Sequence, residues 1–66
     1  MKINADIMEL AAAERGMSLT QLAVESGVSR ATLTTIKKNK SCTGQTFLKI
    51  AKALKVEPKE LFLKEE

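Results

Sequence analysis

The sequence feature that most constrains the fold is a single cysteine, without any histidine, in a chain of only 66 residues. A domain of this size buries only about 60% of the surface that its extended chain would expose, so it is marginally stable without support. One cysteine cannot form an internal disulfide, and without histidine it offers no ligand set for zinc or an iron–sulfur cluster. The same absence excludes Ser-His-Asp and Cys-His catalysis. Regular helix packing and self-association remain as sources of stability.

The hydrophobic pattern predicts an all-α protein. Apolar residues recur with helical spacing along nearly the whole chain, and no segment alternates like a strand. We expect one domain over residues 1–66, with helices at about 4–15, 18–26, 29–38, 44–55 and 58–63. The first of these helices is expected to carry one inward stripe, made of Ile3, Ile7, Leu10, Ala11 and Glu14. The fourth is expected to bury Phe47, Ile50, Ala51 and Leu54, which follow i, i+3, i+4, i+7 spacing.

Local signals mark the ends of these helices. Ser18, Ser29 and Thr43 stand where helix N-caps are expected, since their side-chain oxygens accept hydrogen bonds from first-turn amides. Gly27 is expected to end the second helix and Asn39 the third, each in the left-handed conformation.

The charge distribution points to a polyanionic partner. Residues 26–56 contain seven lysines and arginines and no acid, whereas the rest of the chain has four cations and eight acids. One interpretation is that the lysines only keep helix surfaces soluble. However, lysines on ordinary helices usually alternate with glutamates. An acid-free window therefore favours a polyanion on one side of the molecule.

The second and third predicted helices have the spacing of a helix-turn-helix unit. Ala23 is followed by Gly27 four residues later, then by Val28, Leu33 and Ile36. A small residue permits a close approach of two helices that cross at roughly 90–120° through a tight turn. Glycine takes the positive φ that such a turn requires.

These residues resemble the Cro/CI-type (XRE) helix-turn-helix of bacterial and phage regulators. The resemblance covers about residues 5–63 and includes Leu22-Ala23, Gly27-Val28-Ser29-Arg30, the run from Phe47 to Leu54, and Val56. It implies a compact lambda-repressor-like domain of five helices whose third helix enters the major groove of double-stranded DNA.

The resemblance also implies which residues contact DNA. Base contacts are expected from Arg30, Ala31 and Thr35, with a phosphate contact or a solvated charge as the other interpretation of Arg30. Flanking or phosphate contacts are expected from Ser18, Ser29, Thr32, Thr34, Lys37, Lys38, Lys40, Thr43, Gly44 and Gln45. Three threonines in a surface helix favour contacts, because threonine is a poor helix former.

The chain departs from the family pattern at a few positions. Leu19 stands where many members have a phosphate-binding Gln, so that contact is not expected here. Ala12 and Lys37 stand where the family often pairs an Arg with a Glu, so both partners are missing together. Lys37 is then either a surface side chain or an added phosphate contact. Cys42 is interpreted as a small apolar loop residue.

The leading hypothesis is a cytoplasmic transcriptional regulator of the repressor type that binds an operator as a homodimer. The dimer is expected to form through Leu61, Phe62 and Leu63, because one helix face cannot bury three consecutive apolar residues. Residues 1–4 are expected to lie beside this segment. An antitoxin-type autoregulator with a toxin partner, a member of a pair with a second repressor, and a protein-interaction adaptor are alternatives. No enzyme activity, cofactor, metal or membrane association is expected.

Overall fold

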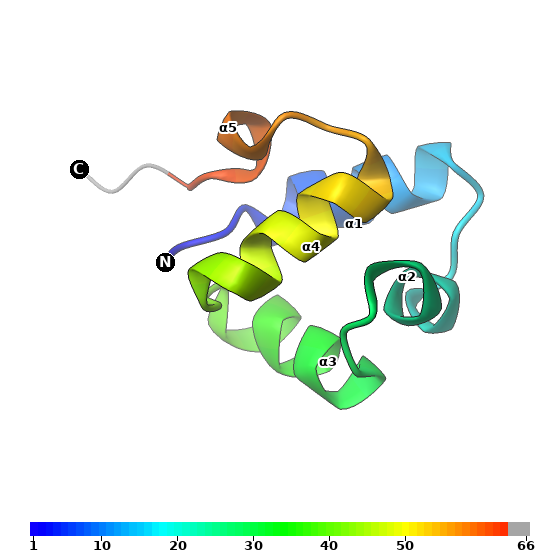
Figure 1. Cartoon of the computed structure of the whole chain (residues 1–66), viewed down its shortest axis with the longest axis horizontal. Helices are drawn as coiled ribbons and strands as arrows, with labels where there is room; N and C mark the ends of the chain where they lie inside the picture. Colours follow the sequence, from blue (N-terminus) through cyan, green and yellow to red (C-terminus); the bar gives the residue numbers. More distant parts are fainter. Residues whose placement is uncertain (64–66) are drawn as a thin grey trace.

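The computed structural model describes residues 1–63 and confirms the predicted all-α fold. Its helices are α1 (Ala5–Glu14), α2 (Leu19–Ser26), α3 (Arg30–Asn39), α4 (Gly44–Leu54) and α5 (Pro58–Leu61). In Figure 1, α4 runs through the middle of the molecule, with α2 and α3 on one side and α5 on the other. α4 packs against α1, α2 and α5, so it organises the core. None of the helices within residues 1–63 has the length and apolar character needed to cross a membrane.

The helix caps follow the local sequence signals. The Oγ atoms of Ser18 and Ser29 accept hydrogen bonds from first-turn amides at 3.1 Å each, and Thr43 Oγ1 accepts one at 3.2 Å. Each bond satisfies an amide that has no partner within its own helix. The side chains that α4 was predicted to bury are all buried.

The inner face of α1 agrees with the prediction only in part. The buried residues are Ala5, Met8, Ala11 and Ala12, whereas Leu10 is 58% exposed. α1 begins after Ile3, so Ile3 is not part of the helical stripe at all. Ile3 and Ala11 are buried as predicted, and Ile7 packs against the core. Leu10 was placed on the wrong side, because apolar residues lie on several sides of this helix and periodicity then gives a weak indication of which side faces the core.

Residues 1–4 form an extended segment that is inserted between two other parts of the chain. On one side, Ile3 N donates to Lys40 O at 3.1 Å and Cys42 N donates to Met1 O at 2.9 Å. On the other, Asn4 N donates to Leu61 O at 2.7 Å. The Ile3 side chain is completely buried in the core between them. The segment lies beside the C-terminal residues, as predicted, and also joins them to the loop after α3.

The end of α5 is a second correction. The predicted helix extended to residue 63, but α5 ends at Leu61, and Phe62 has extended backbone angles (φ −70°, ψ 124°). The chain leaves the helix because Leu63 N donates to Lys2 O at 3.3 Å, beside the segment of residues 1–4. Leu61 is completely buried, so its side chain cannot take part in the dimer interface predicted for it.

Two lysines at helix ends adopt the left-handed conformation, one of them in place of the predicted Asn39. Asn39 remains within α3, and Lys40 is the residue with positive φ (56°). Lys55 ends α4 in the same way, also with φ 56°. The left-handed conformation brings Cβ close to a carbonyl oxygen and costs a residue other than glycine about 1–2 kcal/mol.

Replacing Lys55 with glycine is expected to stabilise the protein. Glycine removes the strain but adds about 0.4–1 kcal/mol of unfolded-state entropy. The free energy of unfolding in urea should therefore rise by about 0.5–1 kcal/mol. Lys49→Gly, in the interior of α4, is the matched control and should lower it by about 1 kcal/mol. A loss of stability in Lys55→Gly would contradict this account of the helix end.

Candidate nucleic-acid interface

The turn between α2 and α3 fixes the angle at which α3 is presented. Gly27 has a φ of 73°, and its amide donates to Ala23 O at 3.0 Å. The buried Ser26 hydroxyl donates to Leu22 O at 2.7 Å and accepts from Val28 N at 3.3 Å. This bond across the turn was not predicted from the sequence.

The start of α3 is held by a paired hydroxyl contact. Ser29 Oγ accepts from Thr32 N at 3.1 Å and donates to Thr32 Oγ1 at 2.7 Å. The predicted flanking residues Ser29 and Thr32 therefore form a cap, with both side chains still exposed to solvent. This cap holds the first turn of α3 in place next to Arg30.

The predicted base-contacting residues share the outer face of α3. Leu33 and Ile36 are buried against the core, whereas Arg30, Ala31 and Thr35 are all exposed. Thr35 Oγ1 donates to Ala31 O at 3.1 Å, and the Thr34 hydroxyl makes the equivalent bond to Arg30 O at 3.0 Å. Both hydroxyl protons are thus donated to carbonyl oxygens of the same helix. Toward a ligand, these threonines offer a methyl group or an acceptor oxygen.

A second group of predicted contacts follows α3 along the chain. Lys38 and Lys40 are exposed at the end of α3, and α4 begins shortly afterwards at Gly44. Thr43 Oγ1 donates to Thr46 Oγ1 at 3.0 Å and caps α4, as Ser29 caps α3. The exposed first turn of α4, with Gly44 and Gln45, presents amides of the kind that bind anions at helix N-termini.

Lys37 forms an ion pair that sequence analysis did not predict. Its Nζ lies 2.7 Å from Glu9 Oε1 of α1, and both side chains are close to half exposed. The positions where the family often pairs an Arg on the first helix with a Glu on the third hold Ala12 and Lys37 here. The helices are still linked by an ion pair, but the base is on α3 and the acid, Glu9, is one turn before Ala12. No signal in the sequence could have found this pair, because the partners are 28 residues apart.

The remaining predicted sites are placed as follows. Ser18 caps the exposed start of α2, and its Oγ accepts from Gln21 N at 3.1 Å. Cys42 packs partly buried against the core, and burial raises the pKa of its thiol, with a smaller opposing effect of the N-terminal ammonium. Within residues 1–63, no group of three or more His, Cys, Asp or Glu side chains could hold a metal ion.

The comparison with protein families decides the identity of the fold. A family model, the Cro/C1-type HTH DNA-binding domain, matches residues 7–63. The chain belongs to this family. The comparison with curated proteins found no match. The Cro/C1-type domain binds DNA, and DNA is a polyanion of the kind that the charge distribution indicated.

The ion pair with Glu9 predicts a difference between two adjacent lysines of this Cro/C1-type domain. Lys37 is already neutralised by a carboxylate, whereas Lys38 has no ion pair with residues 1–63. Lys38→Ala should reduce the slope of log K for DNA against log salt by about 1 per chain. Lys37→Ala should leave that slope nearly unchanged and lower stability by at most about 1 kcal/mol. Equal slope changes in the two variants, measured by fluorescence anisotropy over a salt series, would show that Lys37 also meets phosphate.

Proposed function

We propose that this Cro/C1-type domain is a sequence-specific transcriptional regulator that binds an operator as a homodimer and represses by occluding a promoter. The observation that carries the proposal is the outer face of α3. Arg30, Ala31 and Thr35 are exposed there on a helix that a bonded turn and a Ser29 cap hold at a fixed angle. Recognition helices present their N-terminal residues to base edges in this way.

Arg30 is the residue proposed to read sequence. It lies in the first turn of α3, directly after the cap, and its side chain makes no ion pair with residues 1–63. The planar guanidinium bonds guanine O6 and N7 together, whereas a lysine acts as a point charge. Thr35 lies farther along the same face, and its methyl group could contact a thymine methyl. Lys38, Lys40 and the first amides of α4 are proposed to bind phosphates on either side.

Selection of bound DNA from a random pool tests the proposal. It should yield two related half-sites whose centres are about 10 bp apart, one helical turn. Arg30→Ala should cost about 1–3 kcal/mol and relax the preference at one base pair of each half-site. Lys40→Ala is the matched variant and should weaken every sequence alike. If Arg30→Ala instead weakens all operator variants equally, Arg30 is a phosphate contact and the assignment of base readout is wrong.

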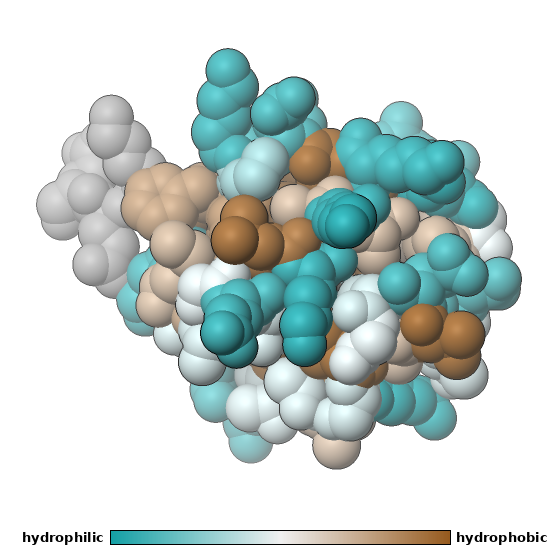
Figure 2. Space-filling view, viewed as in Figure 1, coloured by the Kyte–Doolittle hydropathy of each residue, from teal (hydrophilic) through white to brown (hydrophobic). Residues whose placement is uncertain are grey.

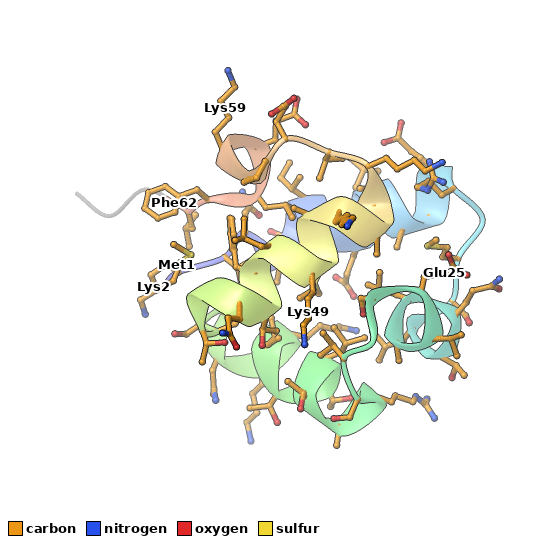
Figure 3. The ribbon with its side chains drawn as sticks, in the orientation of Figure 1. Met1, Lys2, Glu25, Lys49, Lys59 and Phe62 are labelled. Atoms are coloured by element: carbon orange, nitrogen blue, oxygen red, sulfur yellow. The ribbon has the colours of Figure 1, made fainter. Side chains whose placement is uncertain are left out.

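The homodimer is proposed to form through Phe62 and Leu63. Phe62 is 49% exposed, and Leu63 is partly buried. Met1, which is 57% exposed, lies next to Phe62 in Figure 3. Met1 and Phe62 are thus two large apolar side chains that lie together on the surface. Such a patch suits a two-fold interface, in which the same residues of each chain contact one another.

A double variant tests this interface. Phe62→Ala with Leu63→Lys should sediment as a monomer and lose affinity for a two-half-site operator, because only a dimer contacts both half-sites at once. Val24→Lys changes another strongly exposed apolar residue, on α2, and is the control that should remain a dimer. A double variant that keeps the sedimentation coefficient of the unmodified chain would place the interface elsewhere.

A further inference from the structure

A basic hollow lies outside the candidate nucleic-acid interface. It has a volume of about 460 Å³ and is formed where the end of α1, the end of α2 and the C-terminal half of α4 meet. Its lining consists of four cations, one carboxylate and two small residues: Arg15, Lys49, Lys52, Lys55, Glu25, Ser26 and Ala53. None of these residues is among the DNA contacts assigned above.

The structure divides the acid-free window of the sequence into two groups of cations. Arg30, Lys37, Lys38 and Lys40 are on α3 and at its end, whereas the later lysines are on α4 and at its end. In Figure 3, Lys49 extends from α4, and Figure 2 shows hydrophilic side chains over the same part of the surface. The α4 lysines therefore need an explanation of their own.

The cations of the hollow are not paired with carboxylates of residues 1–63. Arg15, Lys49, Lys52 and Lys55 are all exposed, and none forms an ion pair with a carboxylate of residues 1–63. Like charges that line one concavity repel one another, and the repulsion falls when an anion binds among them. Glu25 is the single acid in the lining, so the balance of charge remains positive.

The remaining lining indicates which kind of anion fits. Ala53 is the one apolar side chain, so the hollow lacks the apolar core that protein–protein interfaces usually have. It contains no aromatic ring on which a base could stack. The Ser26 hydroxyl is already bonded to Leu22 O and Val28 N. Recognition therefore depends on charge and on the planar Arg15 fork, which suit phosphate groups.

We propose that this hollow is a binding site for a small oligophosphate, a ligand that carries several phosphate groups close together. The site is separate from the DNA-binding face of α3. Its size is within the range of small-molecule sites, about 300–1,000 Å³.

The backbone at Lys55 supports a role for its side chain. Lys55 has a φ of 56°, at a helix end where glycine would be less strained. A lysine that lines a basic hollow at this position supplies a charge that glycine cannot. Lys55→Gly therefore separates the effect of the backbone strain from the effect of the side-chain charge. It should stabilise the fold and weaken oligophosphate binding.

Titration of inorganic triphosphate into the full chain, without DNA and at constant ionic strength, tests the proposal. Calorimetry should show saturable binding of one triphosphate per chain. Arg15→Ala, Lys52→Ala and Lys55→Gly should each weaken it about two- to fivefold, as expected for exposed ion pairs. Lys59→Ala is the matched control, because it removes the same charge from α5, away from the hollow (Figure 3). Absence of saturable binding, or an equal loss in Lys59→Ala, would overturn the proposal.

A second arm distinguishes free oligophosphate from the phosphates of DNA. Lys52→Ala should lower the affinity for triphosphate and leave the affinity for a mixed-sequence duplex nearly unchanged. Lys38→Ala should have the opposite effect. If Lys52→Ala weakens the duplex as strongly as Lys38→Ala does, the hollow belongs to the DNA surface and the proposal is wrong. The triphosphate titration contains no DNA, so its outcome does not depend on the proposed regulatory function.

Discussion

The attachment of α3 to the body of the protein by two side chains is the constraint on which the rest of the structure depends. Leu33 and Ile36 are the buried residues of this helix, and its other side chains remain exposed. A helix with the proposed role of entering a DNA groove cannot bury more of its surface without losing contacts to the ligand. Its orientation must therefore be secured at its ends, by bonds that leave the outer face free.

Both ends of α3 are secured in this way. At the start, the left-handed Gly27, the Ser26 hydroxyl and the Ser29 cap satisfy the backbone of the turn. At the far end, Lys37 binds Glu9 of α1, and the carbonyl of Lys40 accepts from Ile3 N. The first group of bonds is local in sequence, whereas the second joins the end of α3 to residues near the beginning of the chain. Two kinds of interaction thus hold one helix in place.

The same distinction explains what could be predicted from the sequence. Caps, turn glycines and the apolar face of α4 depend on residues a few positions apart, and the sequence was sufficient for them. The ion pair of Lys37, the pairing of residues 1–4 and the extended conformation of Phe62 depend on segments that meet only in the folded chain. The inner side of α1 was predicted only in part for another reason, since its many apolar residues and alanines gave no clear contrast between faces. The outer face of α3 was predictable because it is what remains once Leu33 and Ile36 point inward.

The proposed DNA contacts rest on both the structure and the family. Exposure and capping support the positions of Arg30, Ala31 and Thr35, and membership of the Cro/C1-type family supplies the ligand. The charge of a residue alone was less informative. The seven cations of the acid-free window are divided between two regions of the structure, and one of these cations, Lys37, is neutralised by Glu9. A count of lysines in the sequence therefore overstates the charge available to DNA.

The hydrogen bond between Leu63 N and Lys2 O, 3.3 Å long, gives the fold a ring-like topology. The backbone runs from residue 2 through every described helix and returns at residue 63 to lie beside residue 2. A short peptide that joined these two positions would close the backbone with little change in geometry, and new ends could then be opened in the exposed connection between α1 and α2. Such a circular permutant would keep α2, the turn and α3 as one uninterrupted segment at the beginning of the chain. We expect it to fold into the same arrangement of helices with a different order of elements along the sequence.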